Sequence, residues 1–183
     1  MNKTLLSAAL IAGFGIAAFA PQAARAVDGT VTINGKIEAN TCAINTPGVG
    51  SSFTVTLPTV QNTALASSGQ VAGTTPFSFV LTGCTGITAG NISTDFQSPA
   101  ANVLPDGNLK NTGTAALVEV QVLNNNGAAV LLNAAPGAQN ATSVAVTAGA
   151  TGATLPYYAQ YYATGASTAG TVATTVQYSI TYP

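Results

Sequence analysis

Few side chains in this sequence could take part in catalysis or bind a metal. The 183-residue chain contains no His, two Cys and five acidic residues. Nucleophilic catalysis needs a base beside the nucleophile, and a metal site needs a cluster of His, Cys, Asp or Glu ligands. The acids stand apart from one another in the sequence, and no glycine-rich phosphate-binding motif is present. We therefore expect no catalytic residue, no metal and no cofactor, and the sequence argues against an enzyme.

The N-terminal segment has the pattern of a secretory signal peptide. Lys3 provides a positive charge, an apolar run follows from Leu5 to Ala20, and Ala24 and Ala26 place small residues before a cleavage point. A membrane anchor is the alternative, but the apolar run is shorter than the roughly 20 residues that a span needs. We expect residues 1–26 to be removed, which leaves a mature chain without direct membrane insertion.

Both cysteines, Cys42 and Cys84, lie in the exported part of the chain. In an oxidising compartment two cysteines of a small exported domain pair. Two free thiols or a metal site are the alternatives, but no His and no third Cys supports them. The sequence predicts one structural disulfide between Cys42 and Cys84.

Charged residues are scarce, at 5% of the chain. After removal of residues 1–26 the bases are Lys36 and Lys110 and the acids number five, so the net charge is 2 − 5 = −3. Two lysines cannot form a basic patch, which excludes nucleic acid as a partner and electrostatic attachment to anionic lipid.

The mature chain reads as a series of β-strands. No segment has a convincing helical period, and β-favouring runs recur about every ten residues between Gly, Pro, Asn and Ser. This spacing predicts an all-β sandwich of Ig-like topology. The runs are 51–57, 76–81, 116–123, 128–132, 143–147, 154–163 and 171–182.

The last run alternates most regularly, and it raises the question of a missing strand. Val172, Val176, Tyr178 and Ile180 share one parity with Thr174, so one face of this run should be buried. An Ig-like sandwich needs one more strand beside it, and none follows. Such a fold exposes an apolar groove and an unpaired sheet edge, while the mature N-terminus offers a spare alternating strand. The two features together suggest complementation between molecules by β-strand addition.

Four motifs resemble those of major fimbrial subunits (pilins) of the type 1, chaperone–usher class. They are "GTVTINGKI" ahead of Cys42, "FSFVLTGC" ending at Cys84, "LPYYAQYYATG" and "AGTVATTVQYSITY". Each is weak alone, but their order and spacing are specific, and the resemblance covers essentially the whole mature chain. It implies an incomplete Ig-like β-sandwich that lacks its last strand.

The resemblance also implies how that sandwich is completed. A periplasmic chaperone lends a strand until an outer-membrane usher exchanges it for the N-terminal extension of the next subunit. In this chain the extension would be residues 27–37 and the pilin domain residues 38–183. Gly29 would fit a constricted part of the groove where a Cβ would clash. The residues facing the groove would be Val27, Gly29, Val31, Ile33, Gly35 and Ile37.

At the other end of the chain the resemblance assigns Tyr182 and Pro183 to the site where the chaperone anchors its client. Two basic chaperone residues would bind the Pro183 carboxylate by charge-assisted hydrogen bonds. Two features depart from the family pattern. Only Val27 and Asp28 precede Gly29, and Pro183 stands where a polar residue is frequent.

Asn34-Gly35 is a signal for a tight hairpin, which competes with the extended donor strand. A hairpin here would use the residues that a neighbouring subunit needs, so we favour a continuous strand. The predicted function is that of a structural subunit of an adhesive fimbrial shaft at the cell surface, partnered by identical and related pilins, the chaperone and the usher. A minor or adaptor subunit of the same fibre is the alternative, and a secreted Ig-like binding module is a second one.

Overall fold

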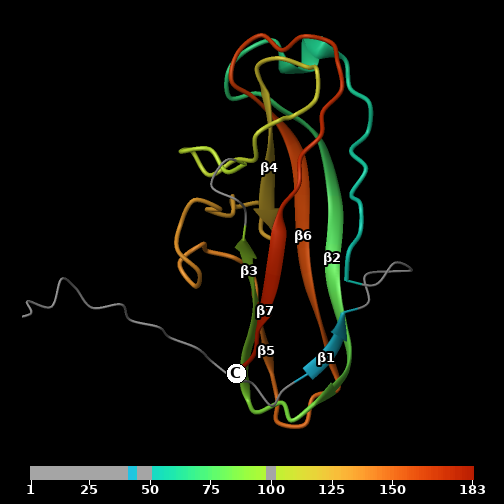
Figure 1. Cartoon of the computed structure of the whole chain (residues 1–183), viewed down its shortest axis with the longest axis vertical. Coiled ribbons are helices and arrows are strands. Elements are labelled where there is room, and N and C mark those ends of the chain that lie inside the picture. The colour runs from blue at the N-terminus through green and yellow to red at the C-terminus, as the bar shows by residue number, and fades with distance from the viewer. Residues whose placement is uncertain (1–40, 45–50, 98–101) are drawn as a thin grey trace, which may run out of the picture. The chain divides into compact units, whose positions relative to one another are not determined.

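Two antiparallel β-sheets make up the part of the chain that the structure, a computed structural model, describes: residues 41–44, 51–97 and 102–183 (Figure 1). All of these residues belong to one unit, Ile37–Pro183. The larger sheet has the strand order β1-β2-β6-β4 and the smaller one β5-β3-β7. The larger sheet consists of β1 (Thr41–Ile44), β2 (Val71–Thr85), β6 (Gly152–Ala163) and β4 (Val118–Asn124). The smaller sheet consists of β5 (Ser143–Val146), β3 (Gly90–Gln97) and β7 (Gln177–Thr181), and a 3₁₀ turn, η1, covers Asn62–Leu65.

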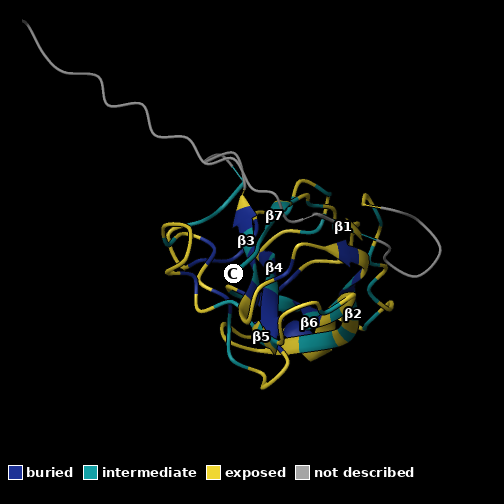
Figure 2. Cartoon of the chain, turned by 90° about the horizontal axis from the view of Figure 1, so that it is seen from below, coloured by how far each residue is buried: buried dark blue, intermediate teal, exposed yellow. Residues whose placement is uncertain are grey.

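The core lies between the two sheets and is built by alternation along the strands (Figure 2). Phe79 and Leu81 of β2, Tyr157 of β6, and Ile92 and Phe96 of β3 are all buried. Their neighbours in sequence turn to the opposite face, as the period of two in a strand requires. The predicted all-β fold is therefore confirmed, and it matches an Ig-like sandwich in architecture.

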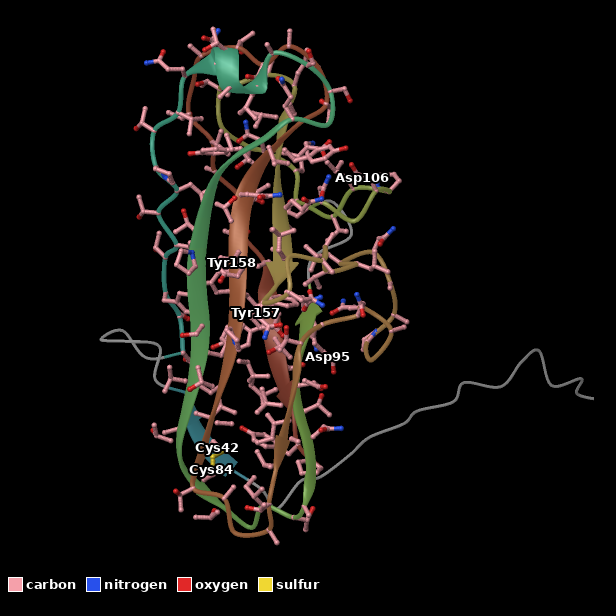
Figure 3. The ribbon with its side chains drawn as sticks, turned by 180° about the vertical axis from the view of Figure 1, so that it is seen from behind. Cys42, Cys84, Asp95, Asp106, Tyr157 and Tyr158 are labelled. Carbon is pink, nitrogen blue, oxygen red and sulfur yellow. A yellow bond between two sulfur atoms is a disulfide. The ribbon has the colours of Figure 1, made fainter. Side chains whose placement is uncertain are left out.

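The predicted disulfide is also present. Cys42 of β1 and Cys84 of β2 are bonded, with their Cα atoms 4.0 Å apart (Figure 3). β1 pairs with β2 antiparallel, and the register shifts between Thr41 and Ala43, beside the bonded cysteine. The bond therefore fastens a four-residue strand to the long central strand β2 at one end of the larger sheet.

Several strand boundaries differ from those expected. The run 51–57 is not part of a sheet and begins with a turn and a bend at Ser51 and Ser52, and the run 171–182 forms a strand only over Gln177–Thr181. The run 128–132 makes only an isolated bridge, between Leu123 and Ala129. Strands β1 and β3 were not among the predicted runs. In β3 only Ile92 and Phe96 are large apolar residues on the buried face, which makes its alternation weak in the sequence.

Within the described ranges, no helix is both long and apolar enough to cross a bilayer.

Candidate functional site: an apolar groove with unpaired edges

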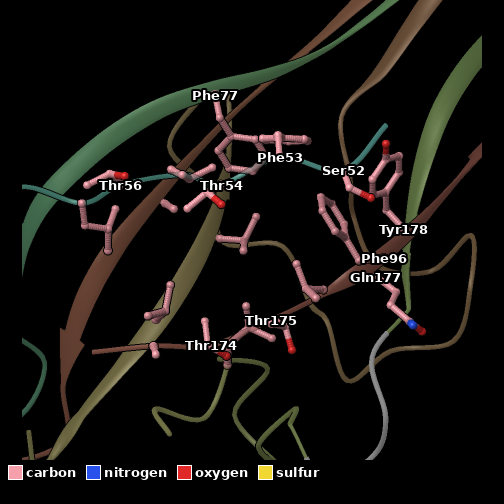
Figure 4. A pocket seen from close by; sticks show the side chains of 18 of the residues that line it. Ser52, Phe53, Thr54, Thr56, Phe77, Phe96, Thr174, Thr175, Gln177 and Tyr178 are labelled. Atoms are coloured by element: carbon pink, nitrogen blue, oxygen red, sulfur yellow. The ribbon is translucent and has the colours of Figure 1, made fainter. Parts of the chain in front are cut away.

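An open groove of about 930 Å³ runs along the sandwich between two extended segments (Figure 4). The first wall is residues 51–57, and the second wall is residues 172–178, which leads into β7. The floor between them belongs mainly to the larger sheet. It is formed by Phe77, Phe79, Phe96, Leu109, Val120, Val122, Ala159 and Tyr161.

The first wall has the side-chain pattern of a strand but no strand partner. Phe53, Val55 and Leu57 are half-buried and pack on the core, while Thr54 and Thr56 are exposed. No backbone hydrogen bond joins residues 52–57 to another described residue. Because extended backbone groups that lack a partner are strong donors and acceptors, this wall is an open sheet edge.

The second wall is hydrogen-bonded to the rest of the chain on one side only. On its outer side, Thr112 and Ala115 donate their backbone N–H groups to the carbonyls of Ala173 and Thr171, at 2.8 and 3.0 Å. Alternate residues of a strand direct their backbone groups to opposite sides. The backbone groups of Val172, Thr174 and Val176 therefore face the groove, and within the described ranges they have no backbone partner.

Aromatic rings fill one end of the groove floor. Phe79 lies at the centre, with the Phe53 ring 5.6 Å and the Tyr178 ring 4.3 Å from it between centroids. Phe77 and Phe96 also contact this ring, at 5.9 and 6.1 Å. Burial raises the pKa of the Tyr178 phenol, so its hydroxyl keeps its proton and can donate near neutral pH. These rings therefore form one aromatic cluster at the end of the groove that contains Phe53 and Tyr178.

Two hydroxyl groups of the second wall, those of Tyr178 and Thr174, differ in their hydrogen bonding. The Tyr178 hydroxyl donates to the Ser51 carbonyl at 2.5 Å, which joins the second wall to the first. The Thr174 hydroxyl is buried and has no hydrogen-bond partner among the described residues. Neither group belongs to a catalytic arrangement, and no cluster of three or more His, Cys, Asp or Glu occurs in the described ranges.

The residues predicted as functional fall in three places. Cys42 and Cys84 form the disulfide described above. The residues predicted to form the donor strand, Val27 to Ile37, lie outside the described residues, as does the predicted signal peptide. Tyr182 and Pro183 are half-buried at the end of β7, where the Thr88 hydroxyl donates to the Pro183 carbonyl oxygen at 3.2 Å.

Gly90 allows Pro183 to lie at this position. A Cβ at Gly90 would come within 2.4 Å of the Pro183 Cβ, so a side chain there would displace the proline. The proposed anchor is thus held against the beginning of β3. Chaperone binding at Tyr182 and Pro183 stays a prediction.

Sequence reasoning predicted a groove but not the residues of its first wall. The run 51–57 alternates as a paired strand does, and alternation indicates which side chains are buried but not whether the backbone has a partner. The first wall could have been predicted from two alternating runs, 51–57 and 171–182, because no neighbouring strand was assigned to either.

Comparison with known proteins identifies the family. The family model described as "Type-1 fimbrial protein, A" matches residues 57–183, which include the second wall and all strands except β1. The chain belongs to the type-1 fimbrial protein family.

Two curated relatives extend this likeness over nearly the whole chain. The major fimbrial subunit SMF-1 of Stenotrophomonas maltophilia is 45% identical over 170 residues, covering 90% of this chain and 98% of the relative. The F17 fimbrial protein of Escherichia coli is 43% identical over 175 residues, covering 91% of this chain and 94% of the relative. The predicted resemblance to major pilins is confirmed.

Solved structures agree on the fold. A subunit of a chaperone–usher pilus aligns with a TM-score of 0.59 at 19% identity, covering 86% of this chain and 96% of that one. The P pilus rod subunit PapA aligns with a TM-score of 0.57 at 18% identity, covering 78% and 99%. The family and its structural neighbours are structural pilins, not enzymes.

Proposed function

We propose that this type-1 fimbrial protein builds the shaft of an extracellular fimbria by accepting, in the groove between residues 51–57 and 172–178, the N-terminal strand of another copy. As a member of its family the chain is a structural subunit of a pilus shaft, located in the extracellular fimbrium. The proposal concerns how the subunits join.

A single observation carries this proposal. Two extended segments, residues 52–57 and 172–176, border an apolar groove, and their facing backbone groups lack strand partners within the described ranges. One inserted strand could hydrogen-bond to both edges and cover the floor at the same time. Peptide recognition by strand addition works in this way: the main chain gives affinity, and alternate side chains give specificity.

Residues 27–37 fit the groove in length and in pattern. Seven residues line each wall, and an extended segment of that number spans at most roughly 23 Å. In the sequence, Val31, Ile33 and Ile37 alternate with polar residues, and Gly29 and Gly35 share their parity. A strand from residue 27 to residue 37 is thus long enough to cover both walls and presents one apolar face to the floor.

The exchange should give a tight contact. Burying Val31, Ile33 and Ile37 would contribute roughly 1.5–3 kcal/mol each. Hydrogen bonds to two sheet edges would add to this and would make dissociation slow. Slow dissociation suits a fibre that is exposed to shear.

An open groove of this kind requires protection before assembly. Exposed apolar surface and unpaired edges promote aggregation. We therefore also propose that a periplasmic chaperone lends a strand to the groove, anchored at Tyr182 and Pro183, and that an outer-membrane usher carries out the exchange. The docked position of Pro183 against Gly90 is compatible with a fixed anchor.

Peptide complementation tests the groove. The mature chain with Ile33→Asp keeps its own groove but loses its donor strand, so it should stay monomeric. Adding a synthetic peptide of residues 27–37 should raise its melting temperature by roughly 10 °C, because the peptide restores the missing strand.

Two controls make the test specific. The same peptide with Gly29→Leu should stabilise far less, since a side chain at this position would clash in the groove. Val55→Asp in the acceptor should also abolish the effect, because it places a charge on the groove side of the first wall. An unchanged melting temperature with every peptide would mean that the fold is already complete, and a secreted binding module would become the better interpretation.

A further inference from the structure

We propose that Tyr178 is a latch that bridges the aromatic end of the groove and slows the insertion of a donor strand. This inference rests on the proposed function of the groove. It concerns how fast the groove accepts a strand, not whether it accepts one.

The latch is a hydrogen bond between the two walls. The Tyr178 hydroxyl donates to the Ser51 carbonyl at 2.5 Å, and the two residues are 127 positions apart in the sequence. Ser51 is the first residue of the first wall, and Tyr178 is the last residue of the second. The bond therefore joins the walls at one end of the groove, where Figure 4 shows the Tyr178 ring beside the chain at Ser52.

Aromatic packing on Phe79 holds the Tyr178 ring in place. The Tyr178 and Phe53 rings, one from each wall, both contact the Phe79 ring, with centroid distances of 4.3 and 5.6 Å. At the opposite end the walls carry Leu57 and Val172, and within the described ranges no backbone hydrogen bond joins residues 56–57 to residues 172–173. The two ends of the groove thus differ, because the hydrogen bond between Tyr178 and Ser51 bridges one of them.

An inserted strand would compete with this bond. A strand between the walls has to pair with both edges, and each pairing needs a separation of about 4.8 Å between neighbouring strands. The Ser51 carbonyl lies in a turn next to the open edge of residues 52–57, and it accepts the hydrogen bond from Tyr178. A strand that extends to this end of the groove would have to pass between the two segments that the bond joins, so insertion along the full groove would require the hydroxyl to release Ser51.

The expected consequence is kinetic. Removing the hydroxyl should raise the rate of strand association and leave the dissociation rate of the filled groove unchanged, because the bond exists only in the empty state. The bond lies at the exposed rim of the groove, where water can replace it. The rate should therefore rise roughly 2- to 5-fold, the lower part of the range that one net hydrogen bond allows.

Tyr178→Phe tests the latch, because it keeps the ring on Phe79 and removes only the hydroxyl. It is introduced into the full mature chain that carries Ile33→Asp, and association of a fluorescent peptide of residues 27–37 is followed by stopped flow. The matched control is Tyr158→Phe, since Tyr158 lies on β6 with Tyr157 and Ala159, its neighbours, directed into the core. The control should leave both rates unchanged.

Each outcome is decisive. Faster association with an unchanged dissociation rate in Tyr178→Phe alone supports the latch. Equal association rates in Tyr178→Phe and the parent chain overturn it, and so does a parallel change of both rates, which would mean that the hydroxyl stabilises the filled groove as well. Failure of the peptide to bind the parent chain would instead refute the proposed function, and the latch with it.

Discussion

At the scale of single residues, Thr174 carries a buried polar group without a hydrogen-bond partner in the described part of the chain. This group is its hydroxyl, which belongs to the second wall. A buried polar group without a hydrogen-bond partner lowers the stability of the fold by about 1–3 kcal/mol. An apolar group of the same shape does not carry this desolvation penalty. Valine has nearly the same shape as threonine.

Thr174→Val should therefore stabilise the monomeric chain that carries Ile33→Asp by about 1 kcal/mol, measured by urea unfolding. The control is Thr175→Val, because Thr175 is the next residue of the same wall but is exposed, and its hydroxyl accepts a long, exposed hydrogen bond from the Asn102 side chain at 3.4 Å. Equal shifts in the two variants would show that β-propensity, and not the buried hydroxyl, is responsible.

Glu119 and Asp106 share one amide donor. The Asn108 side chain donates to Asp106 Oδ2 at 2.9 Å and to Glu119 Oε2 at 3.0 Å. Burial, and then the neighbouring Asp106, raise the pKa of Glu119 above its ordinary value of 4.5, although the Asn108 hydrogen bond lowers it. The folded state therefore binds the proton more tightly than the unfolded state, and stability falls as the pH rises from 4.5 through the folded-state pKa.

Glu119→Gln should be more stable than the parent chain near pH 7, and the difference should shrink as the pH falls toward 4.5. The amide oxygen of Gln can still accept from Asn108, so the geometry is kept. Thermal melts of both chains between about pH 4 and pH 7.5 measure the effect. A difference that does not depend on pH would contradict this assignment.

At the scale of elements, the sequence predicted which faces are buried better than it predicted which segments form sheets. Val172, Thr174, Val176 and Tyr178 are all half-buried with exposed residues between them, as their parity predicts. Yet only Gln177–Thr181 of this run is a strand, because β3 pairs with it there and ends at Gln97. Periodicity reports burial, whereas a sheet requires a partner whose position is set by the tertiary fold.

Strand β3 shows the converse limitation. It is central to the smaller sheet, yet its buried face includes Thr94 between Ile92 and Phe96, and glycine begins it. Its polar neighbours are explained only by long-range contacts: Asp95, for example, accepts hydrogen bonds from the Gly137 N–H and the Thr181 hydroxyl, both at 2.7 Å. Such contacts cannot be read from a local window. For the groove, likewise, the sequence predicted an unfilled site but not its first wall.

The disulfide crosslinks β1 to β2. Cys42 and Cys84 are 42 residues apart, and a crosslink of that span should stabilise the fold by about 4 kcal/mol in the chain-entropy model. It holds β1, which has only four residues and ends shortly before the first wall.

Replacing both cysteines by alanine in the chain that carries Ile33→Asp should therefore lower the free energy of unfolding by about 2–4 kcal/mol. Urea unfolding measures this. Reductant should destabilise the parent chain by a similar amount and leave the double variant unchanged. A loss well below 1 kcal/mol would mean that β1 is held by its pairing with β2 alone.

At the scale of the whole molecule, donor and acceptor are different surfaces of the same chain. The proposed donor is residues 27–37, and the proposed acceptor is the groove between residues 51–57 and 172–178. A contact between two different surfaces is heterologous, and unless its rotation closes a ring it produces an open filament. Inactivating either surface alone should consequently stop the growth of the filament.

Two variants of the full mature chain test this directly. Ile33→Asp inactivates the donor and Val55→Asp inactivates the groove, so each should be monomeric alone. Their mixture should form a dimer and nothing larger, because the strand of Val55→Asp fills the groove of Ile33→Asp and both remaining surfaces are inactive. Thr54→Asp is the matched control: Thr54 is on the same wall but exposed, so this variant should still form filaments. Light scattering and electron microscopy distinguish these species, and filaments from either single variant would show that the subunits join through a different pair of surfaces.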